Sequence, residues 1–363
     1  MSGLPDFPWD SLAAHAATAR AHPDGIADLS VGTPVDSVPA VAQAALAATT
    51  DTPGYPATYG TERLRDAAAG WMRRRLGVDA DPANVLPALG AKELVAWLPT
   101  LLGFGPGDTV GFPSLAYPTY DVGARLAGAR PQVIDATLSV GPARVAMLWV
   151  NSPANPTGRV LPVDHLRKMV AWCRERGTIL VSDECYIEFG WDAEILPHSI
   201  LHPDICGDTH VGLLAVHSLS KRSNLAGYRA GFVAGDASLT QALLAVRKHA
   251  GMIVPAPIQA AMAAALDDDA HVDEQRARYA ARRAVLWPAL EAAGFRVEHS
   301  QAGLYLWATR DEDCWTSVGW LAERGILVAP GVFYGAAGAR HVRVALTASD
   351  ERVAAAARRL HDA

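Results

Sequence analysis

The sequence predicts an α/β protein in which a mostly parallel sheet is covered by helices and a smaller α+β region follows. From about residue 44 to 250, short β-branched runs alternate with amphipathic helical stretches, as in parallel strands joined by helices. After Gly251 the pattern changes to a long helical stretch at about 255–293, followed by further strand patterns. We therefore expect a large domain at 44–250 and an α+β region after it.

The expected strands follow one another along the chain, and several end in polar residues. Those of the first region cover residues 108–112, 132–134, 145–150, 179–182, 213–216 and 231–233. Those of the second region cover residues 295–298, 303–308, 326–329 and 342–346. Because open α/β sheets bind ligands at the carboxyl ends of their strands, the residues that follow these runs are candidates for a site.

Composition restricts the classes of function. The 363 residues are half apolar and 19% charged, with a formal net charge of −6, which is typical of a globular enzyme and disfavours nucleic acid as a partner. The apolar stretches are too short to cross a membrane, and the first six residues show no signal-peptide pattern. The four cysteines and twelve histidines show no metal-ligand spacing. We expect a cytoplasmic protein without a metal site.

Lys221 is the most informative residue of the chain. It follows the apolar run 213–216, lies beside Ser218 and Ser220, and precedes Arg229. A lysine at the end of a buried strand is costly unless its charge is neutralised or its amine is used covalently. Hydroxyls and a guanidinium suit a phosphate, and an amine beside them indicates pyridoxal phosphate, whose aldehyde forms a Schiff base with lysine. Taken alone, so short a motif is also compatible with a solvated lysine in a loop.

Two upstream strand ends offer partners for the ring of such a cofactor. Asn155 follows the run 145–150, and its amide can donate to a phenolate oxygen. Asp183 ends the run 179–182 and can pair with a pyridinium nitrogen, while Tyr186 can donate to the same phenolate. Each has a structural alternative, because Asn-Pro-Thr-Gly is a common turn and an aspartate in this position is a common helix N-cap.

A third junction can bind an anion. The strand-like run 85–89 leads into Gly90, Ala91 and Lys92, after which a helical pattern begins. The backbone amides of such a turn face an anion at the helix N-terminus. Any strand–Gly–helix junction has the same pattern, so this signal is weak by itself.

Together and in this order, these segments resemble the fold-type I pyridoxal-phosphate aminotransferases of classes I and II over nearly the whole chain. The resemblance implies that Lys221 is the Schiff-base lysine and the general base and acid, with Asp183 and Tyr186 completing the catalytic set. It places Tyr117 on the cofactor ring, and it joins the arm 1–43 to 251–363 as one small domain. The cofactor-binding residues that it implies are Gly90, Ala91, Lys92, Tyr117, Asn155, Asp183, Tyr186, Ser218, Lys221 and Arg229.

Two more segments extend the resemblance to substrate binding and assembly. Tyr55 lies in a segment that resembles the one whose tyrosine reaches the phosphate of the neighbouring subunit, which implies a homodimer with shared active sites. Arg343 matches the arginine that binds the substrate α-carboxylate, a task that suits a bidentate guanidinium. The backbone at Gly32 and the side chain of Asn155 complete the implied substrate site. An arginine on an edge strand is the alternative for Arg343.

The substrate follows from a narrower resemblance. Segments 29–36, 220–229 and 302–309 resemble those of actinobacterial N-succinyldiaminopimelate aminotransferases. That resemblance implies glutamate as donor and N-succinyl-2-amino-6-ketopimelate as acceptor, in the diaminopimelate branch of lysine synthesis. Such an acceptor carries a distal carboxylate, for which Arg222 is a candidate, although a surface residue or a pair with an acidic neighbour is an equally good interpretation.

Three other functions share parts of these motifs. A broad aspartate, alanine or aromatic aminotransferase and a C–S β-lyase of the cystathionine type use the same cofactor machinery, so the motifs do not separate them. A regulator that senses pyridoxal phosphate needs a DNA-binding domain before the cofactor domain. Only about 40 residues precede the expected large domain, without a basic surplus, which disfavours the regulator.

Overall fold

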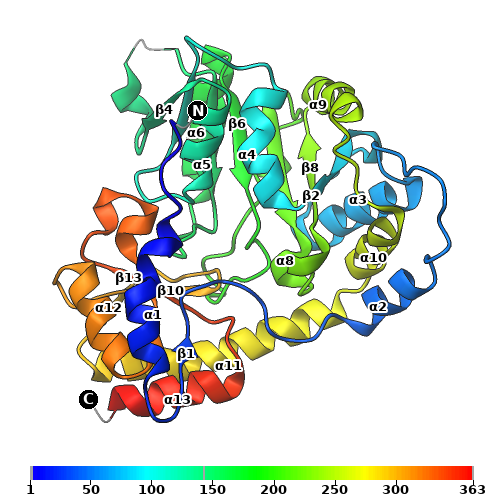
Figure 1. The fold of residues 1–363 in the computed structure, drawn as a ribbon. Coiled ribbons are helices and arrows are strands. Elements are labelled where there is room, and N and C mark those ends of the chain that lie inside the picture. Colours follow the sequence, from blue (N-terminus) through cyan, green and yellow to red (C-terminus); the bar gives the residue numbers. More distant parts are fainter. Residues whose placement is uncertain (1–2, 142–143, 362–363) are drawn as a thin grey trace.

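The computed structural model describes residues 3–141 and 144–361 and has a seven-stranded sheet at its centre (Figure 1). β8 runs antiparallel to its neighbours β2 and β7, and the other pairs are parallel. From edge to edge the strands are β2 (Val85–Leu89), β8 (Ala230–Gly235), β7 (Leu213–Ser218), β6 (Ile179–Asp183), β5 (Met147–Asn151), β3 (Thr109–Phe112) and β4 (Arg130–Val133). The predicted mostly parallel sheet is confirmed.

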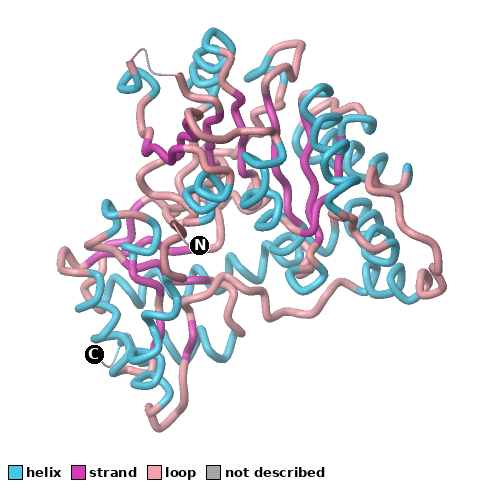
Figure 2. Tube along the Cα trace, turned by 45° about the horizontal axis from the view of Figure 1, so that its top comes forward, coloured by secondary structure: helices cyan, strands magenta, loops and turns pink. Residues whose placement is uncertain are grey.

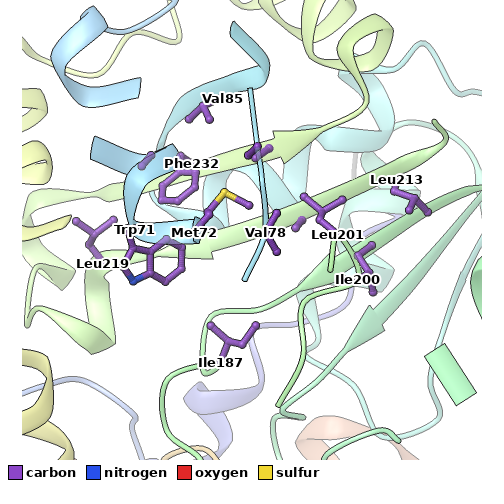
Figure 3. Close-up of a cluster of buried hydrophobic side chains, with 14 of the residues drawn as sticks. Trp71, Met72, Val78, Val85, Ile187, Ile200, Leu201, Leu213, Leu219 and Phe232 are labelled. Atoms are coloured by element: carbon purple, nitrogen blue, oxygen red, sulfur yellow. The ribbon is translucent and has the colours of Figure 1, made fainter. Parts of the chain in front are cut away.

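Helices cover both faces of this sheet because its central strands are apolar on both sides. Leu213 and Ala215 of β7 belong to the core under α3 (Glu62–Leu76), α6 (Val163–Arg176) and α10 (Ala256–Asp267). Leu214 and Val216 belong to the opposite core. The helices on that side are α4 (Ala91–Leu101), α5 (Thr119–Leu126) and α9 (Ala237–Ala250). Figure 3 shows the first core, in which Trp71 and Met72 of α3 pack near Phe232 of β8.

A second group of strands lies apart from the first, as Figures 1 and 2 show. Its antiparallel sheet has the order β12 (Ala329–Pro330), β13 (Val342–Ala345), β10 (Tyr305–Thr309), β9 (Arg296–Glu298). β1 (Ala27–Asp28) of the N-terminal arm pairs with β11 (Ile326–Leu327). The helices packed with these strands are α1 (Ala13–Arg20), α11 (Ala270–Ala292), α12 (Cys314–Glu323) and α13 (Asp350–His361).

Short helices complete the described chain. The α-helices are α2 (Ala40–Ala47), α7 (Pro203–Cys206) and α8 (Leu219–Arg222). The 3-10 turns are Pro8–Leu12, Pro82–Asn84, Thr137–Val140, Ala226–Tyr228, Gly331–Tyr334 and Ala336–Gly338. No helix in the described ranges combines the length and the apolarity needed to cross a membrane.

Two expected elements differ from the structure. The long helix expected at 255–293 is two helices, α10 and α11, because Asp268 adopts an extended backbone and its carboxylate accepts the Ala270 N–H at 3.0 Å. The strand expected at 326–329 is divided between β11 and β12, which belong to different sheets. The domain boundaries at 43/44 and 250/251 stay predictions; α10, which follows the second, packs in the core of the large sheet.

Candidate active site

The strand ends of the large sheet bring the predicted residues together. Asp183 is the last residue of β6 and lies in register with Asn151 of β5 and Val216 of β7. β7 ends at Ser218, and α8 begins at the next residue, so its first turn carries Lys221. The carboxyl ends of three neighbouring parallel strands thus form one edge, as the sequence predicted.

Asp183 is buried and held from two sides. Its Oδ2 accepts the Tyr120 hydroxyl at 2.7 Å, and its Oδ1 accepts the Cys185 N–H at 3.2 Å. Burial raises the pKa of this carboxyl, and the two hydrogen bonds oppose that effect. No helix begins at Asp183, so the N-cap alternative is wrong. The carboxylate is fixed where it can pair with a ring nitrogen.

Lys221 is not a solvated loop lysine. Its Nζ donates to the carbonyl oxygen of Gly32, in the N-terminal arm. Burial lowers the pKa of the amine, an effect that the nearby Tyr305 hydroxyl opposes. A lowered pKa favours the neutral amine, which is the form that acts as nucleophile or base.

The candidate anion-binding turn lies at the start of α4. Gly90 has φ +80°, and a Cβ at this position would come 2.5 Å from Nη2 of Arg229. The Arg229 guanidinium, held by a 2.7 Å bond from Nη1 to the Ala226 oxygen, therefore faces the first turn of the helix. Backbone amides at a helix N-terminus and a guanidinium are both groups that bind phosphate, so this turn remains the candidate phosphate site.

Pairing of β7 with β8 places Ser218 near the first residue of α4. It is in register with Gly231 of β8, and a Cβ on Gly231 would lie 3.1 Å from the backbone nitrogen of Ala91. The Ser218 hydroxyl accepts the Ser220 N–H at 3.1 Å. The side chain of Lys92 is exposed and its Nζ lies 5.5 Å from the ring of Phe7, so only its backbone remains a candidate for the phosphate.

Tyr117 lies next to Tyr120, whose hydroxyl donates to Asp183. Its ring meets that of Tyr120 edge to face, with centroids 6.0 Å apart. Burial raises the pKa of Tyr117 to about 12, so the phenol stays neutral. A neutral, half-buried aromatic here suits the predicted stacking on a ring.

Arg343 is a buried cation that no carboxylate of the described residues neutralises. It is 3% exposed, and its Nη1 and Nη2 donate to Asn155 Oδ1 at 2.9 Å and to the Ser30 carbonyl at 2.8 Å. Its Nε has no hydrogen-bond partner in the described chain. β13 lies between β12 and β10, so the edge-strand alternative is wrong. A buried guanidinium of this kind is a site for an anionic ligand.

Asn155 connects Arg343 of β13 with the strand ends of the large sheet. Its side-chain oxygen accepts from Arg343, and its backbone N–H donates to Asn151 Oδ1 at 2.7 Å. Asn151 also donates to the Asp183 carbonyl at 2.8 Å. The turn is therefore tied to both Arg343 and β6, and within the described chain no hydrogen bond occupies the Asn155 amide nitrogen, so it is a candidate donor.

Tyr186 pairs with a residue to which the sequence analysis gave no role. Its hydroxyl lies 3.0 Å from that of Tyr305. Burial raises the pKa of Tyr186, whereas the charges of Arg343 and Lys221 overcome burial at Tyr305 and lower its pKa. A Cβ on Gly32 would overlap the Tyr305 hydroxyl, so only glycine allows this approach.

Tyr305 and Tyr120 were both missed, although each had a signal. Tyr305 lies on β10, the strand paired with the one that carries Arg343. Tyr120 is the second residue of α5 and lies three positions after Tyr117, which precedes the helix, so the short spacing of the two tyrosines was the available signal.

Two residues lie elsewhere. Tyr55, in the segment between α2 and α3, is fully exposed at 101% and does not pack in its own chain. Arg222 is buried, donates from Nε to Glu188, and donates from Nη1 to the Ala265 carbonyl at 3.0 Å. The structure therefore supports the acidic-neighbour interpretation of Arg222.

Comparisons with known proteins agree with this geometry. The family model described as aminotransferase class I and II matches residues 24–360. The chain is 64% identical over 99% of its length to all of the 4-dedimethylamino-4-oxo-anhydrotetracycline transaminase OxyQ of Streptomyces rimosus. It is 65% identical over 99% of its length to 86% of the probable aminotransferase Rv1178 of Mycobacterium tuberculosis.

A solved structure supports the fold independently. The probable N-succinyldiaminopimelate aminotransferase of Thermus thermophilus superposes with a TM-score of 0.88 at 28% identity. The match covers 98% of this chain and 100% of that one. The two relatives at 64% and 65% identity carry other names, so the narrower resemblance to the succinyldiaminopimelate enzymes is not specific.

Proposed function

The chain belongs to the class I and II aminotransferases, which use pyridoxal 5′-phosphate, and we propose that it moves an amino group between glutamate and a keto acid that carries a second carboxylate. The observation that supports an α-carboxylate substrate is the buried Arg343, which has no carboxylate partner in the described chain. A buried cation without a counterion is costly, and the α-carboxylate of an amino or keto acid supplies that counterion.

The residues fit the cofactor. Pyridoxal phosphate, when bound, supplies an electron sink for negative charge at the substrate α-carbon. The Arg229 guanidinium packs directly against Gly90, where a Cβ would come 2.5 Å from its Nη2, so the amides of the turn and this cation would hold the phosphate together. Asp183, at the end of β6, would hold the proton on the ring nitrogen.

The remaining residues orient the reactants and move the proton. Arg343 binds the α-carboxylate together with Asn155, and Lys221 carries the α-proton on its Nζ. Tyr186 and the Asn155 amide would donate to the ring oxygen of the bound cofactor, and Tyr117 would pack on its ring. Burial lowers the pKa of Lys221, which increases the fraction of neutral amine that can act as a base.

For the acceptor we propose N-succinyl-2-amino-6-ketopimelate. The superposition on the probable N-succinyldiaminopimelate aminotransferase supports it. A cyclic ketone is the second candidate, because the 64% identity spans the whole of a relative named for the amination of a tetracycline intermediate. The two differ in chemistry, since the second substrate does not require an α-carboxylate at Arg343.

A panel of acceptors tests the proposal. Rates of amino transfer from glutamate would be measured with the succinylated keto acid, oxaloacetate, pyruvate, phenylpyruvate and a tetracyclic ketone. We expect the highest kcat/KM for the succinylated keto acid, and we expect this kcat/KM to fall strongly in Arg343→Ala. A higher value for the tetracyclic ketone, unchanged in Arg343→Ala, would favour the second candidate, and release of pyruvate and ammonia from cystathionine would indicate a lyase.

We also propose that the enzyme is a homodimer with shared sites. The supporting observation is Tyr55, whose ring is fully exposed in its own chain although the resemblance gives it a phosphate to bind. A large exposed aromatic is typical of an interface residue.

A further inference from the structure

A buried polar cluster lies behind the site, on the opposite face of the large sheet. Neighbouring residues of a strand point to opposite faces, so Glu184 and His217 lie behind the sheet while Asp183 and Ser218 face the site. Glu184 is 1% and His217 2% exposed. Trp71 packs edge to face on His217, with centroids 5.0 Å apart, in the core of Figure 3.

The backbone ties this cluster to the catalytic strands. The Glu184 N–H donates to the Val216 carbonyl of β7 at 2.9 Å. Its Oε1 accepts the Ile200 N–H at 2.9 Å. A shift of Glu184 would therefore move Asp183, the residue before it, against the end of β7.

Several polar atoms of the cluster lack hydrogen-bond partners in the described chain. They are Glu184 Oε2, both ring nitrogens of His217, and Arg222 Nη2. They line a cavity of about 10 Å³, which is near the lower limit for one water molecule. Buried polar groups are seldom left unsatisfied, and a water with three such partners satisfies one atom of each residue.

The charges around Glu184 are already paired with one another. Arg222 pairs with Glu188, Glu188 also accepts from Arg75 at 3.0 Å, and Arg75 pairs with Asp273 at 2.8 Å. Two cations and two anions therefore balance, and none is left for Glu184. Asp183 lies on the other face, but its charge still acts on Glu184. The other titratable groups around the cluster are Cys185 and Glu188 after β6, His217 on β7, Arg222 on α8, Arg75 on α3, and His271 and Asp273 on α11.

An ion pair between Glu184 and His217 does not fit these surroundings. Their Oε2 and Nε2 atoms are 3.6 Å apart, beyond hydrogen-bonding distance. Burial raises the pKa of Glu184 to about 7, although hydrogen bonds from the Ile200 N–H and from the Ser199 and Ser182 hydroxyls oppose that effect. Burial and the nearby Arg222 charge lower the pKa of His217 to about 3. Both groups are therefore neutral in slightly acidic solution, which avoids placing two more charges in the core.

We propose that Glu184 is a positioning residue that keeps its proton in the working enzyme and shares one bound water with His217 and Arg222. The neutral carboxyl leaves Asp183 as the single negative charge at the end of β6 and holds that strand against β7. The inference deepens the proposed function, because it rests on the role of Asp183 in holding the cofactor.

Unfolding of the cofactor-free protein tests the protonation. A carboxyl with a raised pKa ionises in the unfolded chain first, so stability falls as pH rises from about 4.5 to about 7 and changes little above. Glu184→Gln keeps a neutral group at this position, so the fall in stability with rising pH that Glu184 causes should disappear. Between about pH 5 and pH 7, we expect the folding equilibrium constant of the wild type to fall roughly thirtyfold relative to Glu184→Gln. An equal slope in both proteins would overturn the proposal, whatever the acceptor panel gives.

A matched control and a rescue complete the test. Glu274→Gln removes an exposed carboxylate of α11 and should show the wild-type slope. Glu184→Ala should slow the glutamate half-reaction, and Glu184→Gln should restore most of the rate, because a neutral hydrogen-bonding group of that size suffices. A Gln variant as slow as the Ala variant would show that the negative charge is needed and would also overturn the proposal. A protonated carboxyl band in infrared spectra at about pH 6, lost in Glu184→Gln, is expected as well.

Discussion

The substrate end of the site lies inside the chain, whereas its phosphate end lies at the surface. Asp183 and Arg343 are buried, and each has at least two hydrogen bonds within the chain. Arg229 is exposed, and Tyr55 is fully exposed. This difference supports the proposal that one chain fixes the catalytic geometry and that Tyr55 of a second chain helps to anchor the phosphate.

The largest effect is expected at the substrate end. Lys221→Ala should abolish amino transfer and the absorbance of the bound Schiff base, because no other amine at a strand end can replace Nζ. Stopped-flow kinetics and absorbance spectra of the purified variant check this. Normal turnover with an unchanged absorbance band would remove Lys221 from the mechanism.

Asp183→Asn should give the next largest effect, a decrease in kcat of roughly a thousandfold or more. An amide cannot keep the ring nitrogen protonated. It also offers one acceptor where Tyr120 and Cys185 now find two. Cofactor binding by absorbance and the fold by circular dichroism should be retained, so that the loss is one of chemistry. A kcat near the wild-type value would contradict the assignment.

Arg343→Lys should be milder, with kcat/KM for glutamate falling about 10- to 100-fold, the range expected when a charge-assisted hydrogen bond is lost. Lysine keeps the charge but not the fork that reaches Asn155 and the Ser30 carbonyl. Steady-state kinetics and cofactor titration would separate the two ends, because affinity for the cofactor should hardly change. If cofactor affinity fell as much as kcat/KM, the substrate end and the phosphate end of the site would not be separate, and the comparison would be contradicted.

Gly90→Ala probes the phosphate end and should give the smallest effect on chemistry. The new Cβ would displace the Arg229 guanidinium and strain a backbone with φ +80°. We expect cofactor affinity to fall about tenfold, with kcat at saturating cofactor largely kept. Equilibrium dialysis with pyridoxal phosphate measures the affinity. An unchanged affinity would show that the phosphate does not lie in this turn.

The strand ends could be predicted from sequence because local patterns determine them. β5, β6 and β7 are apolar runs that stop at Asn151, Asp183 and Ser218, and parallel neighbours bring their carboxyl ends to one edge. The order of the motifs along the chain then led to the set of site residues, several of which the strand ends bring to one edge of the sheet.

The parts that sequence did not predict depend on contacts between distant segments. The hydroxyls of Tyr305 and Tyr186 lie together although the two residues are 119 positions apart in the chain. Arg222 pairs with Glu188 because folding brings the segment after β6 next to it. The break between α10 and α11 depends on one acidic residue that bonds to the backbone instead of continuing the helix. No periodicity in the sequence encodes these pairings.

Hybrid dimers test the central comparison most directly. A Lys221→Ala chain would be mixed with a Tyr55→Ala chain, after each variant alone is shown to be strongly impaired and exchange of subunits is verified by mass spectrometry. In a hybrid, the intact Lys221 of one chain meets the intact Tyr55 of the other, so random mixing should restore about a quarter of wild-type activity per chain. No recovery, in hybrids shown to form, would contradict the account, because the phosphate end would then be complete within a single chain.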